Sequence, residues 1–177
     1  TFGYGDKPVL VDVAFHARPG TVTAIVGPSG SGKTTIARLI SRFWDVDSGA
    51  VMVDGVDIRE LGTEQLMSRL SMVFQDVYLF DDSLIANIRV GRPDASDEEV
   101  FRAADLSGVT SIANRLGWHT PVGEGGRLLS GGERQRVSVA RALLKQAPIV
   151  LFDEATSALD AENEANILAA MDELREQ

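Results

Sequence analysis

The sequence predicts an α/β fold in which a mainly parallel sheet is covered by helices. Short apolar runs alternate with helical patterns along the chain, as expected for parallel strands joined by helices. Two of these runs, residues 23–26 and 149–152, are continuous rather than alternating, which is typical of strands buried on both faces. A glycine-rich loop of the phosphate-binding type follows the first of them. These observations favour a nucleotide-binding α/β core.

The composition fits one globular domain. The chain has 177 residues, 44% hydrophobic and 24% charged, a balance that supports a folded core. Its net charge of −9 argues against a chain-wide basic surface for nucleic acid, so a phosphate ligand has to be held locally. The lack of cysteine excludes a disulfide framework and a zinc-thiolate site. No apolar run is long enough to span a membrane, and no signal peptide is recognisable.

The remaining elements divide the chain into a core and an insertion. Residues 50–53 and 70–74 are further predicted strands. We expect residues 1–77 and 147–177 to form the nucleotide-binding core and residues 78–146 to form a helical subdomain inserted into it. The last residues continue a helical pattern without a stop signal, so we expect this single domain to be truncated at its C-terminal end.

A capping box marks the start of one helix in the predicted insertion. Ser96 and Glu99 have the spacing with which a serine and a glutamate satisfy each other's backbone amides. The expected buried stripe of the helix that follows consists of Val100, Ala103, Ala104 and Leu106.

The phosphate loop is the most specific motif. It fits G-x-x-x-x-G-K-[ST] at every required position, after a predicted strand and before a predicted helix. Its glycines let backbone amides close around phosphates, while Lys33 would reach the β- and γ-phosphates and Thr34 would ligate Mg²⁺. The alternative is a glycine-rich turn that only caps a helix. The expected nucleotide-binding residues are Gly27, Pro28, Ser29, Gly30, Ser31, Gly32, Lys33, Thr34 and, one step outside the metal's ligands, Thr35.

Two carboxylates follow the second continuous run. Asp153 and Glu154 are expected at the carboxyl end of a parallel strand, where open α/β sheets bind their ligands. We assign Asp153 to Mg²⁺, directly or through water, and Glu154 to the general base that activates a water for attack on the γ-phosphate. The alternative is a helix cap for one acid and a solvated surface for the other.

Residues 129–135 read Leu-Ser-Gly-Gly-Glu-Arg-Gln. Ser130 and Glu133 form a capping box. A serine and two glycines at a helix start also make an anion-binding nest of amides. The amphipathic pattern that follows consists of Val137, Val139, Ala140, Leu143 and Leu144. The string resembles the signature of ATP-binding cassette (ABC) ATPases, and the rest of the chain agrees with that family throughout its length.

The resemblance implies a P-loop NTPase fold with an N-terminal antiparallel β region and a helical subdomain. It also implies ATP and Mg²⁺ as ligands, with Tyr4 stacking on adenine and Gln75 meeting Mg²⁺ or the attacking water. A surface tyrosine near a turn is the alternative for Tyr4. Asp160 would lie in the loop through which one subunit communicates with the site of the other, or else would cap the final helix.

The partners that the resemblance implies are a second nucleotide-binding domain, identical or not, and a transmembrane domain. The signature of one subunit would face the phosphate loop of the other, so that Ser130 and Gly132, with Gly131 in the same nest, contact the partner's γ-phosphate. Residues 75–88 and 120–126 are similar to segments of exporter-type transporters that meet the membrane domain, with Glu124 at intracellular loops. The expected location is the cytoplasmic face of the inner membrane, with no nucleic-acid partner.

The branch of the family is suggested by other stretches. Residues 90–95 and 160–166 resemble mycobacterial siderophore-iron transporters, so a siderophore or its iron complex is the expected substrate. The switch histidine of the family would lie beyond the last residue, and His16 and His119 are both misplaced for it. We therefore expect the 177-residue piece by itself to bind Mg-ATP weakly and to turn it over poorly.

Two functions compete with a transport motor. A soluble ABC ATPase that clamps DNA or the ribosome is disfavoured because only 97 positions separate Lys33 from Ser130, which leaves no room for a long coiled coil. The net acidity also disfavours binding to a phosphate backbone. A nucleotide-binding regulatory module without hydrolysis is disfavoured by Glu154 in the position of the base.

Overall fold

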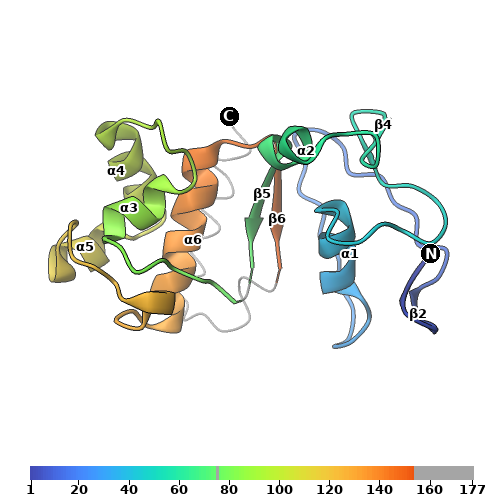
Figure 1. The fold of residues 1–177 in the computed structure, drawn as a ribbon, viewed down its shortest axis with the longest axis horizontal. Helices are drawn as coiled ribbons and strands as arrows, with labels where there is room; N and C mark the ends of the chain where they lie inside the picture. The colour runs from blue at the N-terminus through green and yellow to red at the C-terminus, as the bar shows by residue number, and fades with distance from the viewer. Residues whose placement is uncertain (75, 154–177) are drawn as a thin grey trace. The chain divides into compact units, whose positions relative to one another are not determined.

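The computed structural model describes residues 1–74 and 76–153 (Figure 1). The chain divides into two compact units, Thr1–Leu70 and the part that begins at Ser71.

The first unit contains two short antiparallel ladders. β1 (Phe2–Tyr4) pairs with β2 (Lys7–Leu10), which confirms the expected N-terminal antiparallel β region. β3 (Met52–Val53) pairs with β4 (Val56–Asp57) across Asp54 and Gly55, both at positive φ. Positive φ at both central residues is typical of the type I′ hairpin turn. The strand predicted at residues 50–53 therefore forms only in its second half.

Two helices complete the first unit. α1 (Lys33–Ile40) begins directly after the phosphate loop. Its Leu39 is buried with Phe2 and Leu10 of the first ladder, so this small core fixes the helix on the strands. α2 (Thr63–Arg69) begins after Gly62, whose N–H donates to Gln65 Oε1 over 3.1 Å.

Residues 23–26 do not form the predicted buried strand. Among the described residues the segment has no ladder partner, and Ile25 and Val26 are 40% and 87% exposed. A strand buried on both faces needs hydrogen-bonded neighbours and covering helices. In the described part of the first unit, however, β1 pairs with β2 and β3 with β4. An apolar run indicates burial, but it does not determine which strands will pair with it.

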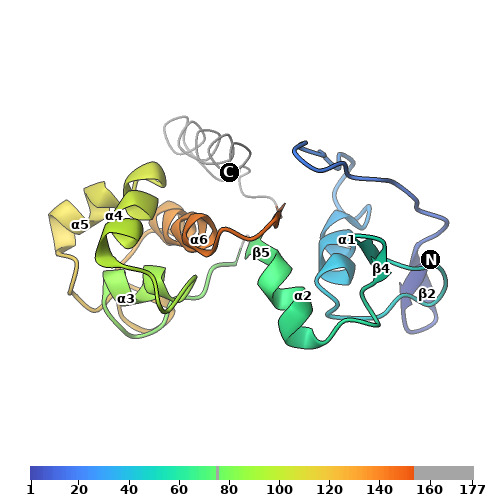
Figure 2. The same ribbon diagram turned by 90° about the horizontal axis from the view of Figure 1, so that it is seen from above.

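The second unit is built around the long helix α6 (Gly131–Lys145). α3 (Leu84–Arg89) and α4 (Asp97–Leu106) both pack against α6, and α5 (Thr110–Leu116) packs against α4 (Figures 1 and 2). Burial of each large aliphatic side chain contributes about 1.5–3 kcal/mol. Fully buried side chains come from all four helices: Leu84, Ile88, Val100, Ile112 and Val137.

The local predictions for these helices are confirmed. Ser96 N donates to Glu99 Oε2 over 2.8 Å, and Ser96 Oγ accepts from Glu99 N over 3.3 Å. The predicted stripe of α4 is buried at three positions and half-buried at Leu106. The predicted apolar face of α6 is buried throughout: Val137, Val139, Ala140, Leu143 and Leu144.

A two-stranded sheet of β5 (Leu70–Val73) and β6 (Ile149–Phe152) confirms two predicted strands. Their arrows run in the same direction in Figure 1, as in a parallel pair. Asp153 N extends the pairing by donating to Val73 O over 3.0 Å. All four residues of β6 are half-buried rather than buried on both faces, because β5 is its one neighbour among the described strands.

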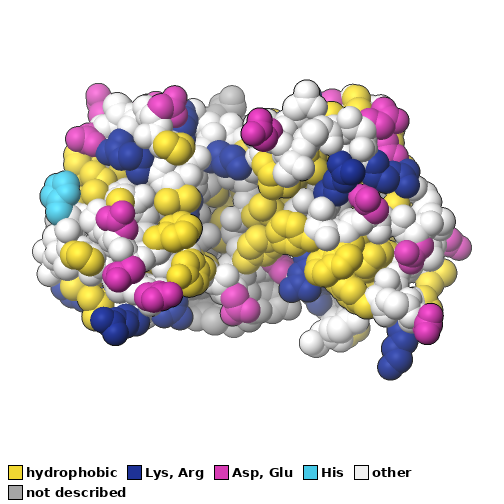
Figure 3. Space-filling model, viewed as in Figure 1, with side chains coloured by type: hydrophobic (Ala, Val, Ile, Leu, Met, Phe, Trp, Pro, Cys, Tyr) yellow, Lys and Arg dark blue, Asp and Glu magenta, His cyan; other side chains and the backbone are white. Residues whose placement is uncertain are grey.

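The surface drawn in Figure 3 mixes both signs of charge, with Asp and Glu interspersed among Lys and Arg. No helix of the described residues is both long and apolar enough to cross a lipid bilayer.

Candidate functional site

The phosphate loop turns sharply before α1. Ser31 N donates to Pro28 O over 3.2 Å, which closes the turn. Gly30 and Gly32 have φ of 78° and 90°, a left-handed conformation that side chains with a Cβ rarely adopt. Gly32 also has no room for a Cβ, which would lie 2.7 Å from Leu10 Cδ2. Gly30 and Gly32 are therefore needed for the backbone conformation of this loop.

Lys33 lies over the same loop. Its Nζ donates to Gly27 O and Pro28 O, each over 3.0 Å. A phosphate oxygen would have to compete with these two neutral carbonyls for the ammonium, and a charged acceptor binds an ammonium more strongly. Thr34 is half-buried and Thr35 buried in the first turn of α1.

Tyr4 stands among aromatic rings at the end of β1. Its ring meets Phe2 edge to face at 5.0 Å and Trp44 at 5.4 Å. The residue is 41% exposed, so one part of the ring is held while another stays accessible for stacking. Trp44 was not predicted as part of this site, because nothing in its local sequence pattern indicates that it meets Tyr4.

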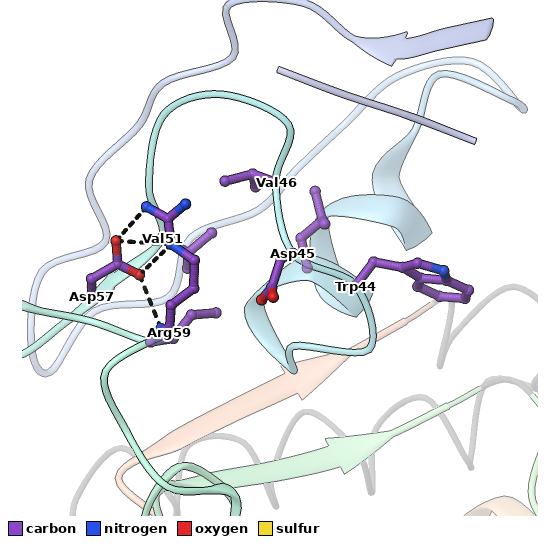
Figure 4. A pocket seen from close by; sticks show the side chains of 8 residues that line it. Trp44, Asp45, Val46, Val51, Asp57 and Arg59 are labelled. Carbon is purple, nitrogen blue, oxygen red and sulfur yellow. Dashed lines mark hydrogen bonds and ion pairs between the residues drawn. The ribbon is translucent and has the colours of Figure 1, made fainter. Parts of the chain in front are cut away.

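A small cavity lies beside Trp44 in the first unit (Figure 4). Its volume is about 10 Å³, room for no more than one water. The ion pair of Asp57 with Arg59, 2.6 Å long, lies at its wall, and the hydrogen bond from Arg59 lowers the pKa of Asp57. This cavity cannot hold a nucleotide.

The signature segment forms the predicted cap at the start of α6. Ser130 N donates to Glu133 Oε2 over 2.8 Å, and Ser130 Oγ accepts from Glu133 N over 3.2 Å. Gly131 and Gly132 occupy the first two helical positions, where an amide has no acceptor within its own helix. A Cβ on Gly131 would meet nothing within 4 Å. The two amides therefore lie at an open helix end.

Glu133 has a second partner, Arg115 of α5, whose Nη2 donates to Glu133 Oε1. Burial by itself raises the pKa of this carboxyl. The hydrogen bonds from Ser130 N and Arg115 outweigh burial and lower the pKa below its usual value. Glu133 is therefore ionised at neutral pH.

An open groove of about 690 Å³ runs past the start of α6. Exposed Tyr78 contributes to it, and its Oη donates to Glu124 Oε1 over 3.4 Å. Glu124 belongs to the 3₁₀ helix η1 (Glu124–Gly126). The residues around the groove are Asp76, Val77, Tyr78, Glu124, Gly125, Arg127, Gly131, Gly132, Arg134 and Gln135.

The two segments expected to face a membrane domain lie side by side. Leu84 N donates to Thr120 O over 3.2 Å, and Val122 N donates to Asp82 O over 3.0 Å. Tyr78 and Phe80 are 55% and 52% exposed, with their rings edge to face at 5.6 Å. Residues 75–88 and 120–126, apart from Gln75, thus contribute to one surface of the second unit.

Asn87 and Arg141, which were not predicted from the sequence, hold this surface in place through hydrogen bonds to its backbone. Buried Asn87 accepts from Phe80 N over 2.9 Å and donates to Phe80 O over 3.0 Å. Arg141 of α6 donates to Tyr78 O over 2.9 Å and to Asn87 Oδ1 over 2.7 Å. Burial lowers the pKa of Arg141 to about 10, so its guanidinium stays protonated at neutral pH.

Replacing Asn87 by Ala should loosen the segment around Phe80. The change leaves Phe80 N and several carbonyls without their partner, at a cost of about 2–3 kcal/mol. We expect the Phe80 amide to exchange with solvent faster by about 10-fold or more, measured by hydrogen exchange on the full-length protein. N114A on the exposed side of α5 is the matched control. Equal exchange in N87A and N114A would contradict the anchoring role.

The structure brings together some of the predicted site residues. Lys33 and Thr34 follow the loop in the first unit, and Ser130, Gly131 and Gly132 share the start of α6 in the second. Asp153 is half-buried at the end of β6. Gln75, Glu154 and Asp160 lie outside the described residues. Within residues 1–74 and 76–153, no three His, Asp or Glu side chains gather as metal ligands would.

Comparisons with known proteins give consistent matches. Residues 10–157 match the family model described as ABC transporter. The chain is 54% identical over 173 residues to the mycobactin import ATP-binding/permease protein IrtB of Mycolicibacterium smegmatis, covering 97% of this chain and 30% of that protein. It is 49% identical over 177 residues to the mitochondrial iron–sulfur clusters transporter ATM1 of Yarrowia lipolytica, covering 98% and 25%.

Two further matches extend the range. The β-(1→2)glucan export ATP-binding/permease protein NdvA of Bradyrhizobium diazoefficiens is 47% identical over 176 residues, which cover 98% of this chain and 29% of that protein. A solved structure of a bacterial Atm1-family ABC exporter with ATP bound superposes with a TM-score of 0.93 at 46% identity, over 98% of this chain and 31% of that one. The chain thus spans less than a third of the length of these relatives.

Proposed function

This chain belongs to the ABC transporter family as an ATPase domain of the exporter type, and we propose that it is the motor of a membrane transporter. It would cleave ATP to ADP and phosphate and use the cycle to move a substrate across the membrane. The observation that supports this proposal is that one chain contains two backbone arrangements suited to binding an anion, the loop before Lys33 and the nest after Ser130.

The phosphate loop holds the triphosphate in this proposal. The backbone amides of residues 27–34 and the ammonium of Lys33 would bind the β- and γ-phosphates. Thr34 and Asp153 offer the hard oxygen donors that Mg²⁺ prefers, and Gln75 can add an amide oxygen. Mg²⁺, when bound, would neutralise charge on the phosphates. Tyr4, held by its ring contacts with Phe2 and Trp44, would stack on the adenine.

Hydrolysis requires a base and a positioned water. We assign the base to Glu154, which directly follows Asp153, and the positioning of the water to Gln75. The resemblance to ABC ATPases supports both assignments.

A second copy, or a similar domain, would complete the site. Its nest of Ser130, Gly131 and Gly132 offers a hydroxyl and two amides to the γ-phosphate bound by the first chain. ATP then favours the closed pair, and loss of the γ-phosphate releases it, because the ligand binds the two states with different affinity. Asp160 would communicate between the two sites.

A transmembrane domain is the second partner. Relatives are named ATP-binding/permease proteins, which supports such a partner for this chain at the inner face of the membrane. The surface that carries Tyr78, Phe80 and Glu124 is the proposed contact, because exposed aromatic side chains anchored on a rigid base suit docking. Relatives named for different cargoes are similarly close, at 47–54% identity, so the cargo would be selected outside this domain. A siderophore substrate remains our prediction.

Replacing Tyr4 by Ala tests the adenine contact. The loss of one stacking partner should raise the KM for ATP about three- to tenfold with little change in kcat. Y4W should restore the KM, because another flat ring can stack in the same place. The measurement is steady-state ATP hydrolysis by the full-length protein. A KM that rises for GTP but not for ATP, or no rise at all, would exclude Tyr4 from adenine binding.

A further inference from the structure

We propose that Arg115 is a positioning residue that neutralises the Glu133 carboxylate, so that the nest at the start of α6 can accept the phosphate end of a nucleotide. This inference rests on the proposed function, because it assigns Arg115 to the nest of Ser130, Gly131 and Gly132. The nest is assembled from α6, and Arg115 is supplied by α5.

The nest contains a built-in conflict of charge. Its cap needs the side chain of Glu133, whose Oε2 accepts from Ser130 N over 2.8 Å. Glu133 lies in the first turn of α6 together with Gly131 and Gly132, whose amides are to bind an anion. Like charges at such separations repel even where water partly screens them. A capping glutamate thus orders the helix start and opposes phosphate at the same time.

Arg115 removes this conflict without disturbing the cap. Its guanidinium binds Oε1, the carboxylate oxygen that Ser130 N does not use. The Glu133 side chain is only 16% exposed, so solvent screens its charge less than at an open surface. Arg136 of α6 donates to Gly108 O over 3.2 Å. Gly108 lies just before α5, so this hydrogen bond links α6 to the start of α5.

The same arrangement without a nest occurs at α4. Ser96 and Glu99 form an equivalent capping box, and Arg92 binds Glu99 Oε1 as Arg115 binds Glu133. There the first helical residues are Asp97 and Glu98 rather than glycines, so this end cannot take an anion. Arg92 also donates to Gln146 at the far end of α6, about 20 Å from the nest along the helix.

The test compares R115A, the double variant R115A/E133Q and R92A in the full-length protein. We expect R115A to raise both the KM for ATP and the dissociation constant of a non-hydrolysable ATP analogue about five- to tenfold. The double variant should return both constants to within about twofold of wild type, because glutamine still accepts from Ser130 N but carries no charge. R92A, which breaks the matched pair, should leave both constants unchanged.

Salt adds a readout that a purely structural role would not move. The ratio of R115A to wild-type constants should shrink as ionic strength rises, because repulsion is screened. A ratio below about twofold at low salt, or a defect in R115A that E133Q does not rescue, would overturn the inference. S130A distinguishes a failure of the role of Arg115 from a failure of the nest. If S130A weakens analogue binding while R115A does not, only the role of Arg115 fails. If S130A binds the analogue as wild type does, the proposed role of the nest fails with it.

Discussion

Replacing Glu154 by Gln is expected to lower ATP turnover of the full-length protein by about 10²–10⁴-fold, the range typical of losing a general base. Glutamine keeps the size of the side chain but cannot take a proton from the attacking water. Affinity for Mg-ATP should stay within a few-fold of wild type, because the phosphate loop and the nest are untouched. Phosphate release and nucleotide binding, measured on the same preparation, separate these two effects.

The matched control for this change is E98Q. Glu98 is exposed in the first turn of α4, and it is not part of any proposed site. Its replacement by the same amide should leave turnover unchanged. If E154Q turned over ATP as fast as E98Q, Glu154 would not be the base.

Replacing Lys33 by Ala is expected to weaken ATP binding by about 10²-fold or more, since charge-assisted hydrogen bonds contribute about 1.5–3 kcal/mol each. Lys33 now donates to two carbonyls of an exposed loop, so its loss should leave folding intact. Titration with a non-hydrolysable ATP analogue, with thermal unfolding in parallel, measures both. R38A on the exposed face of α1 is the control. Analogue binding by K33A at the strength of R38A would show that the loop does not hold phosphate.

Features that depend on a few neighbouring residues were predicted from the sequence. The capping boxes at Ser96 and Ser130 join residues only three apart, and both are present as predicted. The buried faces of α4 and α6 follow from the same short-range periodicity. Local sequence encodes such features because the two partners lie within one helical turn.

Features that join distant residues were not predictable in the same way. Arg141 and Asn87 are 54 positions apart, and Arg115 and Glu133 are 18 apart. Neither pair has a local signature, because each depends on how helices pack. The failure at residues 23–26 has the same cause: an apolar run indicates burial, but pairing is decided by strands elsewhere in the chain.

The candidate site shows the same difference between features that join neighbouring residues and features that join distant ones. The phosphate loop and the nest are contiguous motifs, and both could be placed from their residues. Their meeting across two copies is a proposal that rests on the resemblance, because spacing within one chain does not indicate it. Gln75, Glu154 and Asp160 lie outside the described residues, and the division at residues 77 and 147 into core and subdomain stays a prediction.

The most direct test of the composite site is the structure of the full-length E154Q protein with Mg-ATP bound. We expect the oxygens of the γ-phosphate to lie within hydrogen-bond distance of Ser130 Oγ and Gly132 N from the opposite subunit, with Lys33 contributed by the subunit that holds the rest of the nucleotide. A γ-phosphate contacted by Ser130 and Lys33 of one and the same chain would contradict it.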